Sequence, residues 1–524
     1  MNTDNKTEKT KSANLREVTT EMHDVFIIGG GINGVGIARD AVGRGYSVYL
    51  AEADDLASGT SSQSTKLIHG GLRYLEHYEF KLVREALTER EVLWRVAPHI
   101  IHPMRFILPH HKGLRPWWLL RLGLFMYDHL GGRKRLAATN SVDLTDSEEG
   151  ACLKQNFSKG FEYSDCWVND SRLVVLNAMD AKEYGATIKT QHKCIAVERF
   201  EDCWSVTVEN QLTKETEIVT ARVLINATGP WADDIINIVK PNAEKPSKNI
   251  RKVQGSHIVV PKLYDHDKCY IFQNEDDRIT FAIPYHHDYT YLGTTDYEID
   301  GDPRDAKITE GEIEYLCEAA NDYFKTEITP KDVVSTYAGV RALYNDGDSS
   351  GGKKAQEATR DYILQIDEES ESQAPLVNIF GGKITTYRKL AESMMEIVDD
   401  LLDKDNKHWT ENAHLPGGDF AIDDKQKLHD LFIQDYGFLA EEVITRLFNN
   451  YGSKAALILD DADNEKALGQ HFGHGLYQVE VEYLIKNEFA LKVDDILLRR
   501  TKLGLKFKPK ERKALETWLN NYFS

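Results

Sequence analysis

The sequence predicts an α/β protein, α+β overall, that begins with a Rossmann-like nucleotide-binding unit and ends with a helical domain. Residues 24–54 pass through an apolar strand, a glycine turn, a helix and a second apolar strand. Residues 278–285 and 289–295 have the composition of two paired strands. Residues 423–522 carry apolar side chains at helical spacing, for example Leu428, Leu431 and Phe432. The change from strands to helices along the chain indicates separate domains.

A glycine turn connects the first strand, residues 25–28, to the first helix. Its glycines follow the spacing GxGxxG at Gly29, Gly31 and Gly34. Gly29 permits the tight turn, Gly31 lets a pyrophosphate approach the backbone, and Gly34 lets the helix pack closely on the strand. The N-terminus of the helix offers unpaired N–H groups and a positive dipole to the phosphates. An ordinary glycine-rich turn would also explain the glycines taken alone.

Glu52 follows the second strand, residues 46–51, where a carboxylate can accept hydrogen bonds from ribose hydroxyls. The acid favours a dinucleotide site, but it leaves NAD, NADP and FAD open. Three later segments, residues 61–76, 223–231 and 377–388, favour a flavin because they supply hydroxyls, glycines and a further helix N-terminus. In the last of them, Lys383 is expected at the start of a helix. The candidate cofactor-binding residues in these segments are Ser61, Ser62, Lys66, Leu67, His69, Gly70, Gly71, Ala227, Thr228, Gly229, Gly382, Lys383, Ile384 and Thr385.

The composition is that of a globular protein with an acidic charge balance. Of the 524 residues, 41% are hydrophobic and 28% are charged, and the formal net charge is −20. This balance disfavours nucleic-acid binding, and it means that an anionic substrate needs clustered Arg and Lys. The six cysteines are scattered without a CxxC pair, which is typical of reduced cytosolic thiols. No spacing of His or Cys predicts a metal site.

Residues 1–23 are polar and lysine-rich, which predicts a flexible tail rather than a secretory signal. No apolar run of about 18 residues predicts a transmembrane helix. Residues 114–130 instead combine Trp117, Trp118 and other apolar side chains with flanking arginines. Two interpretations stay open: residues 117–127 lie in a lipid interface, or they form a buried amphipathic helix.

Long sequence strings carry a resemblance to a known family. Among them are IIGGGINGVGIARDA, STKLIHGGLRYLEHYEFKLVREAL, NATGPW, GSHIVVP, LGTTD, GVRAL, ATRDY, FGGKITTYRKLAE and LPGGD. On these strings the chain resembles the FAD-dependent, respiratory glycerol-3-phosphate dehydrogenases of bacteria, within the group that has the fold of D-amino-acid oxidase. The resemblance extends from residue 24 to at least residue 418. Two departures are the longer N-terminal tail and Ala342, where the family commonly has Pro.

The resemblance implies an interleaved architecture. A Rossmann-like FAD-binding domain would comprise residues 24–100, 160–245 and 335–410, and a mixed-sheet substrate domain residues 101–159 and 246–334. Residues 411–524 would form the helical C-terminal domain. Its segment 496–505, ILLRRTKLGL, is shared with the family. We assign no chemistry to this segment, and packing and homodimer formation both stay open.

The resemblance also implies a reaction. Glycerol 3-phosphate would be oxidised to dihydroxyacetone phosphate, with reduction of non-covalently bound FAD and transfer of the electrons to a membrane quinone. The enzyme would be peripheral on the cytoplasmic face of the membrane, with residues 117–127 as its contact. By similarity, Arg73, Tyr74, Arg360 and Lys383 hold the phosphate and Arg341 lies at the carbinol oxygen. A phosphomonoester in so acidic a protein needs such a cationic clamp, although a surface ion pair would explain any one Arg.

The hydroxyl proton needs a base that works near neutral pH, a task that suits histidine. His257, in the GSHIVVP string, is the favoured base, with Arg341 as the stabiliser of developing negative charge. His69 is the other candidate; it lies in residues 61–76, the segment called the flavin loop from here on. Hydrogen bonding to the loop or to the flavin would explain His69 equally well.

Two other functions stay open at this point. An oxidase of the same fold would pass the electrons to oxygen and produce hydrogen peroxide. The insertion common in that branch is not seen here, which favours a dehydrogenase. A non-enzymatic flavoprotein, as a scaffold or a tRNA-modifying binding protein, is disfavoured by the cationic pocket and the acidic charge balance.

Overall fold

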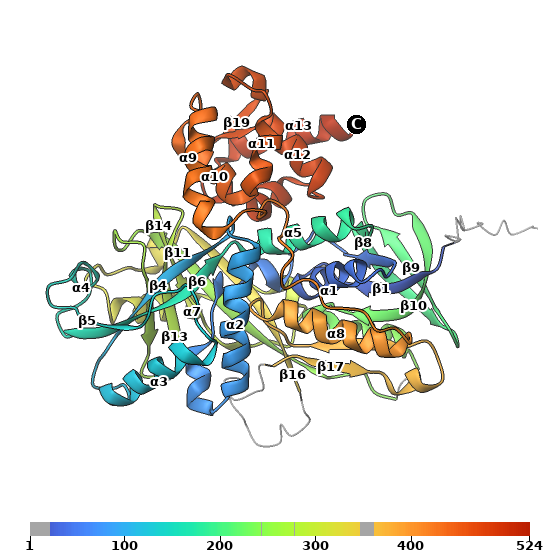
Figure 1. Cartoon of the computed structure of the whole chain (residues 1–524), viewed down its shortest axis with the longest axis horizontal. Helices are drawn as coiled ribbons and strands as arrows, with labels where there is room; N and C mark the ends of the chain where they lie inside the picture. The colour runs from blue at the N-terminus through green and yellow to red at the C-terminus, as the bar shows by residue number, and fades with distance from the viewer. Residues whose placement is uncertain (1–20, 243, 277, 346–360) are drawn as a thin grey trace, which may run out of the picture.

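Two β-sheets lie side by side beneath a helical C-terminal domain (Figure 1). The computed structural model describes residues 21–242, 244–276, 278–345 and 361–524. Both sheets are assembled from segments far apart in the sequence, so that strands of different colour neighbour one another in Figure 1. The predicted fold class, a Rossmann-like domain with an interleaved mixed sheet and a helical C-terminal region, is confirmed.

The first sheet runs in the order β17-β18-β10-β1-β2-β7, with β9 on β10 and β8 on β9. The strands β18, β10, β1, β2 and β7 are parallel to one another, whereas β17 is antiparallel to β18 and β9 is antiparallel to β10. Their bounds are β1 (His23–Ile28), β2 (Val48–Ala51), β7 (Thr187–Lys189), β8 (His192–Arg199), β9 (Trp204–Asn210), β10 (Thr216–Asn226), β17 (Ile363–Ile366) and β18 (Leu376–Phe380). The two strands expected around the glycine turn are β1 and β2.

Both faces of this sheet are covered, which is the normal condition for parallel strands. Val25 and Ile27 of β1 pack in one core with the helices α1 (Ile32–Gly43), α5 (Asp170–Glu183) and α8 (Tyr387–Leu401). Phe26, on the opposite face, packs with Trp204 of β9. The helix α6 (Ala232–Val239) also lies on that second side, where Ile235 joins the same core. Alternation along β1 therefore separates two apolar cores.

The second sheet runs in the order β15-β11-β14-β13-β12-β4-β6-β3, with β16 on β11 and β5 on β6. It is mixed, because β12 is parallel to β4 while the other pairs are antiparallel. Its strands are β3 (Leu67–Ile68), β4 (Ile101–Pro109), β5 (Asn140–Asp143), β6 (Lys159–Val168), β11 (Ile250–Pro261), β12 (Cys269–Gln273), β13 (Ile279–Tyr285), β14 (Tyr289–Gly293), β15 (Tyr297–Glu298) and β16 (Ser335–Tyr344). The strand pair predicted in residues 278–295 is β13 and β14.

Helices cover the two faces of the second sheet. On one face, the helices α2 (Phe80–Val96) and α3 (Trp117–Leu130) pack against β4 and β6. On the other face, α7 (Glu310–Asn321) packs against β11 and β12, and the short helix α4 (Glu148–Ala151) lies near its edge. None of the helices within the described ranges combines the length and the apolar character that crossing a bilayer requires.

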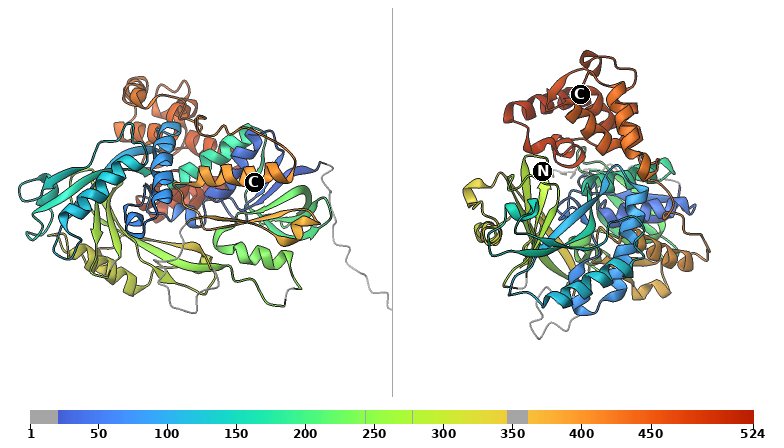
Figure 2. Two further views of the ribbon diagram at one scale, coloured as in Figure 1. Left: turned by 60° about the horizontal axis from the view of Figure 1, so that its bottom comes forward. Right: turned by 60° about the vertical axis from the view of Figure 1, so that its left-hand side comes forward.

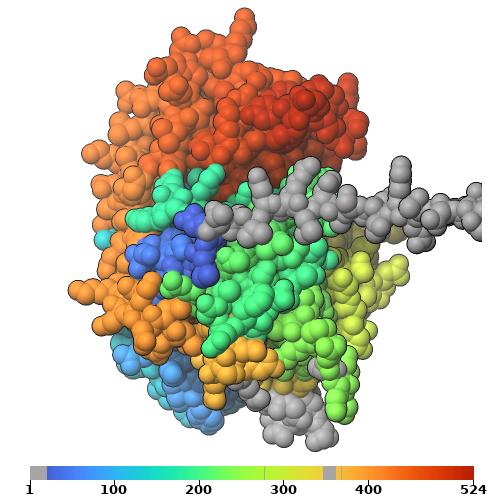
Figure 3. Space-filling view, turned by 90° about the vertical axis from the view of Figure 1, so that its right-hand side faces the viewer, coloured from blue at the N-terminus to red at the C-terminus, as the bar shows by residue number. Residues whose placement is uncertain are grey.

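The C-terminal domain has its own apolar core, formed by residues such as Ile444, Leu484 and Leu515. Its elements are α9 (Lys425–Asp435), α10 (Glu441–Tyr451), α11 (Ala455–Leu459), β19 (His471–Gly473), β20 (Leu476–Tyr477), α12 (Gln478–Asn487), a π-helical turn (Asp495–Arg500) and α13 (Pro509–Phe523). Figures 2 and 3 show this orange and red domain resting directly on the rest of the molecule.

Two details differ from the sequence expectation. β3, β6 and β16, which fall within the segments expected to build the FAD-binding domain, pair in the second sheet; the domain limits themselves stay predictions. The helix expected at Lys383 begins only at Tyr387. Gly381 and Gly382 have positive φ angles of 78° and 95°, so the chain makes a further turn before it can enter the helix.

Candidate active site

A cavity of about 570 Å³ lies between the two sheets. At one end it meets the carboxyl ends of β1, β2 and β10, which is where ligands bind in open parallel sheets. At the other end it meets β11, β13 and β16 of the second sheet. The predicted site residues that line it are Gly29, Gly31, Glu52, Ser61, Leu67, His69, Gly70, Gly71, Arg73, Tyr74, Ala227, Thr228, Gly229, His257, Arg341, Gly382, Lys383, Ile384 and Thr385.

The glycine turn leaves no room for side chains. Gly29 has a φ angle of 112°, which favours glycine. A Cβ atom on Gly34 would lie 2.0 Å from the carbonyl oxygen of Gly29. The helix α1 can therefore approach β1 only because Gly34 has no side chain. Its N-terminus opens beside Gly31, which lines the cavity.

Glu52 is held in place by backbone N–H groups. Gly30 donates a 2.6 Å hydrogen bond to Oε2 of Glu52, and Asp54 donates a 2.8 Å bond to Oε1. Removal of water from the carboxyl group raises its pKa to about 7, although the two N–H donors favour the ionised form. The carboxyl group is thus fixed in position at the end of β2 and can change charge near neutral pH.

Asn33, in the first turn of α1, is a cavity residue that the sequence analysis missed. Its amide nitrogen donates a 3.3 Å hydrogen bond to the carbonyl of Gly381, which connects α1 to the loop before α8. Its Oδ1 is buried and has no hydrogen-bond partner among the described residues. A buried amide oxygen that lines a cavity is available to a ligand donor. The sequence signal for Asn33 is its place between Gly31 and Gly34, inside the glycine turn.

The flavin loop is supported from behind by a buried network. The N–H of Gly70 donates a 2.7 Å hydrogen bond to the hydroxyl of Tyr127 on α3. That hydroxyl lies 2.8 Å from Oδ2 of Asp165, and Asp165 pairs with Arg90 at 2.5 Å. On the cavity side, the N–H of His69 donates to Oγ1 of Thr385 at 3.4 Å. These bonds fix the loop between α3 and the turn before α8.

Three cationic side chains line the cavity: Arg73, Lys383 and Arg341. Lys383 Nζ lies 4.1 Å from the centre of the ring of Tyr74, the residue next to Arg73 in the chain. Arg341 donates from Nη2 to Oγ1 of Thr294 at 3.1 Å, and from Nη1 to the carboxylate of Asp296. The remaining predicted cation, Arg360, lies outside the described residues.

Asp296 is a second cavity residue that the sequence analysis missed. It lies in the LGTTD string, for which no role was assigned, and it lines the cavity beside Arg341. The ion pair fixes the Arg341 guanidinium at the wall of the cavity. β11 brings these distant segments together, because it pairs with β14 and β15, which flank Asp296, and with β16, which carries Arg341.

His257 is buried and lies against the cavity. Its ring stacks on Tyr291, with 4.6 Å between the ring centres, and its Nε2 lies 3.1 Å from Oγ1 of Thr65. Burial lowers the pKa of His257 well below 6.5, and the charges of Lys66 and Arg341 lower it further. The imidazole is therefore neutral near pH 7 and can accept a proton.

Three predicted cofactor-binding residues lie outside the cavity lining: Gly34, Ser62 and Lys66. Gly34 supports the turn, as described above. Lys66 belongs to the flavin loop, but its side chain is buried away from the cavity. Its Nζ pairs with Asp170 at 2.9 Å and donates to the carbonyl of Ser62 at 3.1 Å. Burial lowers the pKa of Lys66 to about 8, although the nearby Asp170 opposes this change.

The geometry of the cavity fits FAD. The glycine turn and the N-terminus of α1 form an open approach for a pyrophosphate, and Glu52 lies where a ribose would sit. Asn33 offers a buried acceptor. The opposite end has the N–H groups and cations that suit the polar edge of a flavin and an anionic substrate.

Comparison with known proteins agrees with this geometry. The sequence profile described as "FAD dependent oxidoreductase" matches residues 24–373, and the profile described as "C-terminal domain of alpha-glycerophosphate oxidase" matches residues 408–520. The chain is 47% identical to D-erythritol 1-phosphate dehydrogenase of Brucella abortus over 501 residues, which are 96% of this chain and 98% of that protein. It is 46% identical to glycerol-3-phosphate dehydrogenase of Pseudomonas aeruginosa over 512 residues, 98% of this chain and 97% of that protein. The chain belongs to the family of FAD-dependent glycerol-3-phosphate dehydrogenases.

A solved member of this family has the same fold. It is the glycerol-3-phosphate dehydrogenase of Bacillus halodurans in complex with FAD, with a TM-score of 0.73 and 25% identity over 96% of this chain and 95% of that one. FAD is accordingly the cofactor of this protein. The roles of individual residues towards FAD stay predictions: Gly31 at the pyrophosphate, Glu52 at the ribose, and residues 61–71 and 382–385 at the flavin.

Proposed function

We propose that the protein oxidises the secondary alcohol of glycerol 3-phosphate to the ketone of dihydroxyacetone phosphate. The observation that carries this proposal is that Arg73, Lys383 and Arg341 all line the FAD cavity. In a protein of net charge −20, such a group is expected where a phosphate dianion must be held. The Pseudomonas aeruginosa relative, a glycerol-3-phosphate dehydrogenase, supports the same substrate.

The protein contributes a phosphate clamp, a base and a stabiliser of negative charge to this reaction. Arg73 and Lys383, with Tyr74, hold the phosphate, so that the carbinol carbon lies at the flavin end of the cavity. Bound FAD supplies the acceptor for the hydride that leaves this carbon. As the hydride leaves and the C=O bond forms, the hydroxyl proton passes to the neutral imidazole of His257. Arg341, held by Asp296, stabilises the negative charge that develops on the oxygen.

A test is to add glycerol 3-phosphate to the purified protein without oxygen and follow the flavin absorbance. Bleaching at a rate of about 1–10³ s⁻¹, the usual range of enzyme turnover, is expected, and an unchanged spectrum would contradict the proposal. Arg73→Met should raise KM strongly while the flavin spectrum before mixing stays unchanged, because the side chain is assigned to the phosphate and not to FAD. Arg115→Met, which removes an exposed ion pair with Glu76, is the matched control.

D-erythritol 1-phosphate is a second candidate substrate. The 47% identity with the dehydrogenase of that name from Brucella abortus supports it. Both molecules are polyol phosphates with a secondary alcohol, so the same cationic end could hold either one. Comparing kcat/KM for the two substrates decides between them. A ratio of about tenfold or more corresponds to one lost hydrogen bond of about 1.4 kcal/mol and would identify the favoured substrate.

We propose a membrane quinone as the electron acceptor, with oxygen as the alternative. The second profile carries the name of an oxidase domain, so the acceptor must be measured. After reduction with substrate, reoxidation by a soluble quinone is expected to be much faster than reoxidation by air. Rapid reoxidation by air with stoichiometric hydrogen peroxide would identify an oxidase instead.

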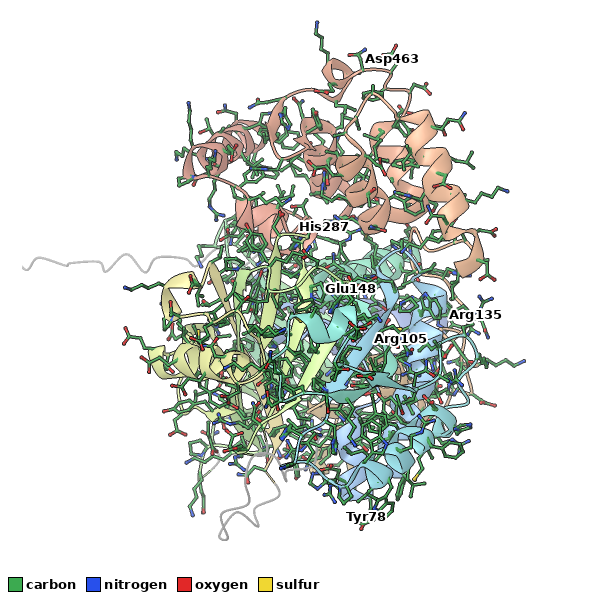
Figure 4. The ribbon with its side chains drawn as sticks, turned by 90° about the vertical axis from the view of Figure 1, so that its left-hand side faces the viewer. Tyr78, Arg105, Arg135, Glu148, His287 and Asp463 are labelled. Atoms are coloured by element: carbon green, nitrogen blue, oxygen red, sulfur yellow. The ribbon has the colours of Figure 1, made fainter. Side chains whose placement is uncertain are left out.

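An exposed apolar surface supports the proposed peripheral position on a membrane. Trp118, Leu122 and Phe125 of α3 are 67%, 48% and 57% exposed, and they share one face of the helix. The neighbouring Tyr78 is 79% exposed and lies at the tip of the molecule, opposite Asp463 of the C-terminal domain (Figure 4). Exposed cations occur in the same segments of the chain, among them Lys81, Arg84, Arg115 and Arg121. An anionic lipid surface is the partner that suits such a combination.

Part of the predicted contact segment is turned inwards. Trp117 stacks on Phe161 at 3.8 Å between ring centres and lies 4.7 Å from Nζ of Lys159. Tyr127 is buried. The helical period separates Trp118, Leu122 and Phe125 from these inward residues, so they carry the proposal.

A flotation assay tests the surface. Trp118→Glu/Phe125→Glu is expected to abolish binding to vesicles that contain anionic lipid. Leu457→Glu, at an equally exposed apolar residue of the C-terminal domain, is expected to leave binding unchanged. Equal loss of binding in both variants would show that added negative charge, not this surface, is responsible.

A further inference from the structure

Segment 496–505 of the C-terminal domain extends into the body of the molecule. Arg500 forms two parallel hydrogen bonds to Asp55, Nη1–Oδ2 at 2.6 Å and Nη2–Oδ1 at 2.7 Å. Arg499 adds a third bond from Nε to Oδ2 at 2.5 Å. Asp55 is 2% exposed, and although burial favours its neutral form, the two guanidinium groups hold its pKa below the ordinary value. The carboxylate is thus charged and depends on the C-terminal domain for its partners.

A second buried carboxylate, Asp170, joins the same segment to the flavin loop. Lys502 donates from Nζ to Oδ1 of Asp170 at 2.8 Å. The other oxygen, Oδ2, accepts from Lys66 at 2.9 Å and from Ser64 at 2.8 Å. Burial opposes ionisation of Asp170, but the two lysines lower its pKa to about 2. Asp170 is therefore an ionised bridge between the C-terminal domain and the flavin loop.

Asp55 and Lys66 mark the two ends of one stretch of chain that forms a wall of the cofactor cavity. The residues of this stretch that line the cavity are Ser58, Gly59, Thr60, Ser61, Gln63, Ser64 and Thr65. Ser61 accepts a 3.0 Å hydrogen bond from the N–H of Ile32 at the start of α1. Thr65 lies against His257, as described above. Residues 55–66 thus connect the pyrophosphate end of the cavity with the candidate base.

We propose that Arg500 and Lys502 are positioning residues, through which the C-terminal domain holds residues 55–66 in the conformation that accepts FAD. The two carboxylates act as anchors at the ends of the wall, and each depends on cations from segment 496–505. Removal of a cation leaves a charged carboxylate buried without a full set of partners, and the wall moves to expose it to water. This gives segment 496–505 a role that goes beyond the proposed reaction and does not depend on the identity of the substrate.

The test is FAD binding to the apoprotein, measured by quenching of flavin fluorescence. Lys502→Met is expected to weaken FAD binding by about tenfold or more, because a buried charge pair is broken. Lys454→Met is the matched control. Lys454 also belongs to the C-terminal domain and also pairs with α5, but its partner Glu183 is exposed and lies at the other end of that helix. The control is expected to bind FAD within about twofold of the unchanged protein.

Hydrogen exchange of the apoprotein separates positioning from general loss of stability. In Lys502→Met, faster exchange is expected within residues 55–66 before it rises elsewhere. Glu488→Gln weakens the buried pair of the Glu488 side chain with Arg172 between the same two parts of the molecule, and it keeps the backbone carbonyl of Glu488 that accepts hydrogen bonds from Arg500. This variant is expected to lower Tm while FAD affinity and exchange in residues 55–66 stay unchanged. Lys502→Arg keeps a cation and is expected to restore most of the FAD affinity.

Two results would overturn the proposal. One is unchanged FAD affinity in Lys502→Met, and the other is an equal loss of affinity in Glu488→Gln at an equal loss of Tm. If Lys502→Met does not fold, Arg499→Met tests the other anchor, because Asp55 then keeps the two bonds from Arg500. Weaker FAD binding by Arg499→Met at unchanged Tm would support the proposal, and unchanged binding would contradict it.

Discussion

Glu52 is expected to couple FAD binding to pH. Its pKa in the protein without FAD is about 7, and an ionised carboxylate accepts hydrogen bonds from ribose hydroxyls better than a protonated one. FAD affinity of the apoprotein is therefore expected to increase as the pH rises through about 7, with release of a proton on binding below that pH. Titrations of the apoprotein with FAD at several pH values measure this.

Glu52→Gln is the matched variant for this pH dependence. It is expected to bind FAD more weakly at high pH and to lose the dependence near neutral pH; retention of the same pH profile would assign it to another group. The stability of the apoprotein should change in the opposite sense. Because the folded protein holds the Glu52 proton more tightly than the unfolded chain does, this contribution to stability falls as the pH rises from 4.5 to about 7.

His257 is expected to act as a base over a wide pH range. Because burial lowers its pKa well below 6.5, the imidazole stays neutral until the pH falls far into the acid range. His257→Gln should lower kcat by a factor of about 10²–10⁴ and leave KM for the phosphate substrate nearly unchanged. In the unchanged enzyme, the acid limb of kcat/KM should lie below pH 6.5.

His286→Gln is the control for this substitution. His286 follows β13 in the same sheet, and burial lowers its pKa to about 3, yet it does not line the cavity. Its replacement should leave kcat within about twofold, as for a group away from the reacting atoms. Equal losses in both variants would indicate that packing of the second sheet, not proton transfer, explains the effect.

At the scale of the element, α3 has two faces with different tasks. Its outer face carries the exposed Trp118, Leu122 and Phe125, whereas Tyr127 on the inner face binds the flavin loop through Gly70. Tyr127→Phe removes the nearer acceptor of the buried Gly70 N–H, at 2.7 Å, and leaves the longer 3.4 Å contact with Oδ1 of Asp165. A loss of about 1–3 kcal/mol is expected when a buried donor keeps only so long a contact.

The loss in Tyr127→Phe should appear in FAD affinity as well as in the thermal unfolding of the holoprotein, since Gly70 lines the cavity. Leu122→Ala, on the outer face of the same helix, is expected to change neither quantity measurably. A stable Tyr127→Phe protein with unchanged FAD affinity would show that the loop does not depend on α3.

The elements that the sequence predicts best are those determined by local chemistry. One stretch of about 30 residues predicts the glycine turn, α1 and the place of Glu52, as expected for a compact strand–turn–helix unit. The helix at residues 117–130 was also predictable, but the inward direction of Trp117 was not. Helical periodicity predicts which residues share a face, but not which element that face packs against. The start of α8 was misplaced since Gly381 and Gly382 adopt positive φ angles, which composition alone does not reveal.

Contacts between distant segments were not predictable. Asp296 meets Arg341 only through strand pairing in the second sheet. Lys502 and Asp170 are 332 residues apart in sequence, and each one alone resembles an ordinary surface charge. No local pattern in the sequence connects such distant charges, so the anchors of the cavity wall are visible only in the structure.

At the scale of the whole molecule, the buried ion pairs between the C-terminal domain and the body make separate unfolding unfavourable. Undocking would expose or isolate the pairs of Glu488 with Arg172, Arg500 with Asp55 and Lys502 with Asp170. Breaking one buried pair by loss of a partner costs about 3–5 kcal/mol, which is a large part of the stability of a typical protein. The apoprotein is therefore expected to unfold in one calorimetric transition although its C-terminal domain has a separate core.

Salt provides the means to examine this cooperativity. Exposed pairs such as Lys454 with Glu183 are screened at high ionic strength, whereas buried pairs are screened much less. A single transition should therefore persist when salt is raised from about 0.1 M to about 1 M, where the Debye length falls from about 10 Å to about 3 Å. If the heat-capacity trace instead splits into two peaks at high salt, exposed charges hold the domain in place. The buried carboxylates Asp55 and Asp170 would then tolerate loss of their partners, which would also weaken the case for their role as anchors.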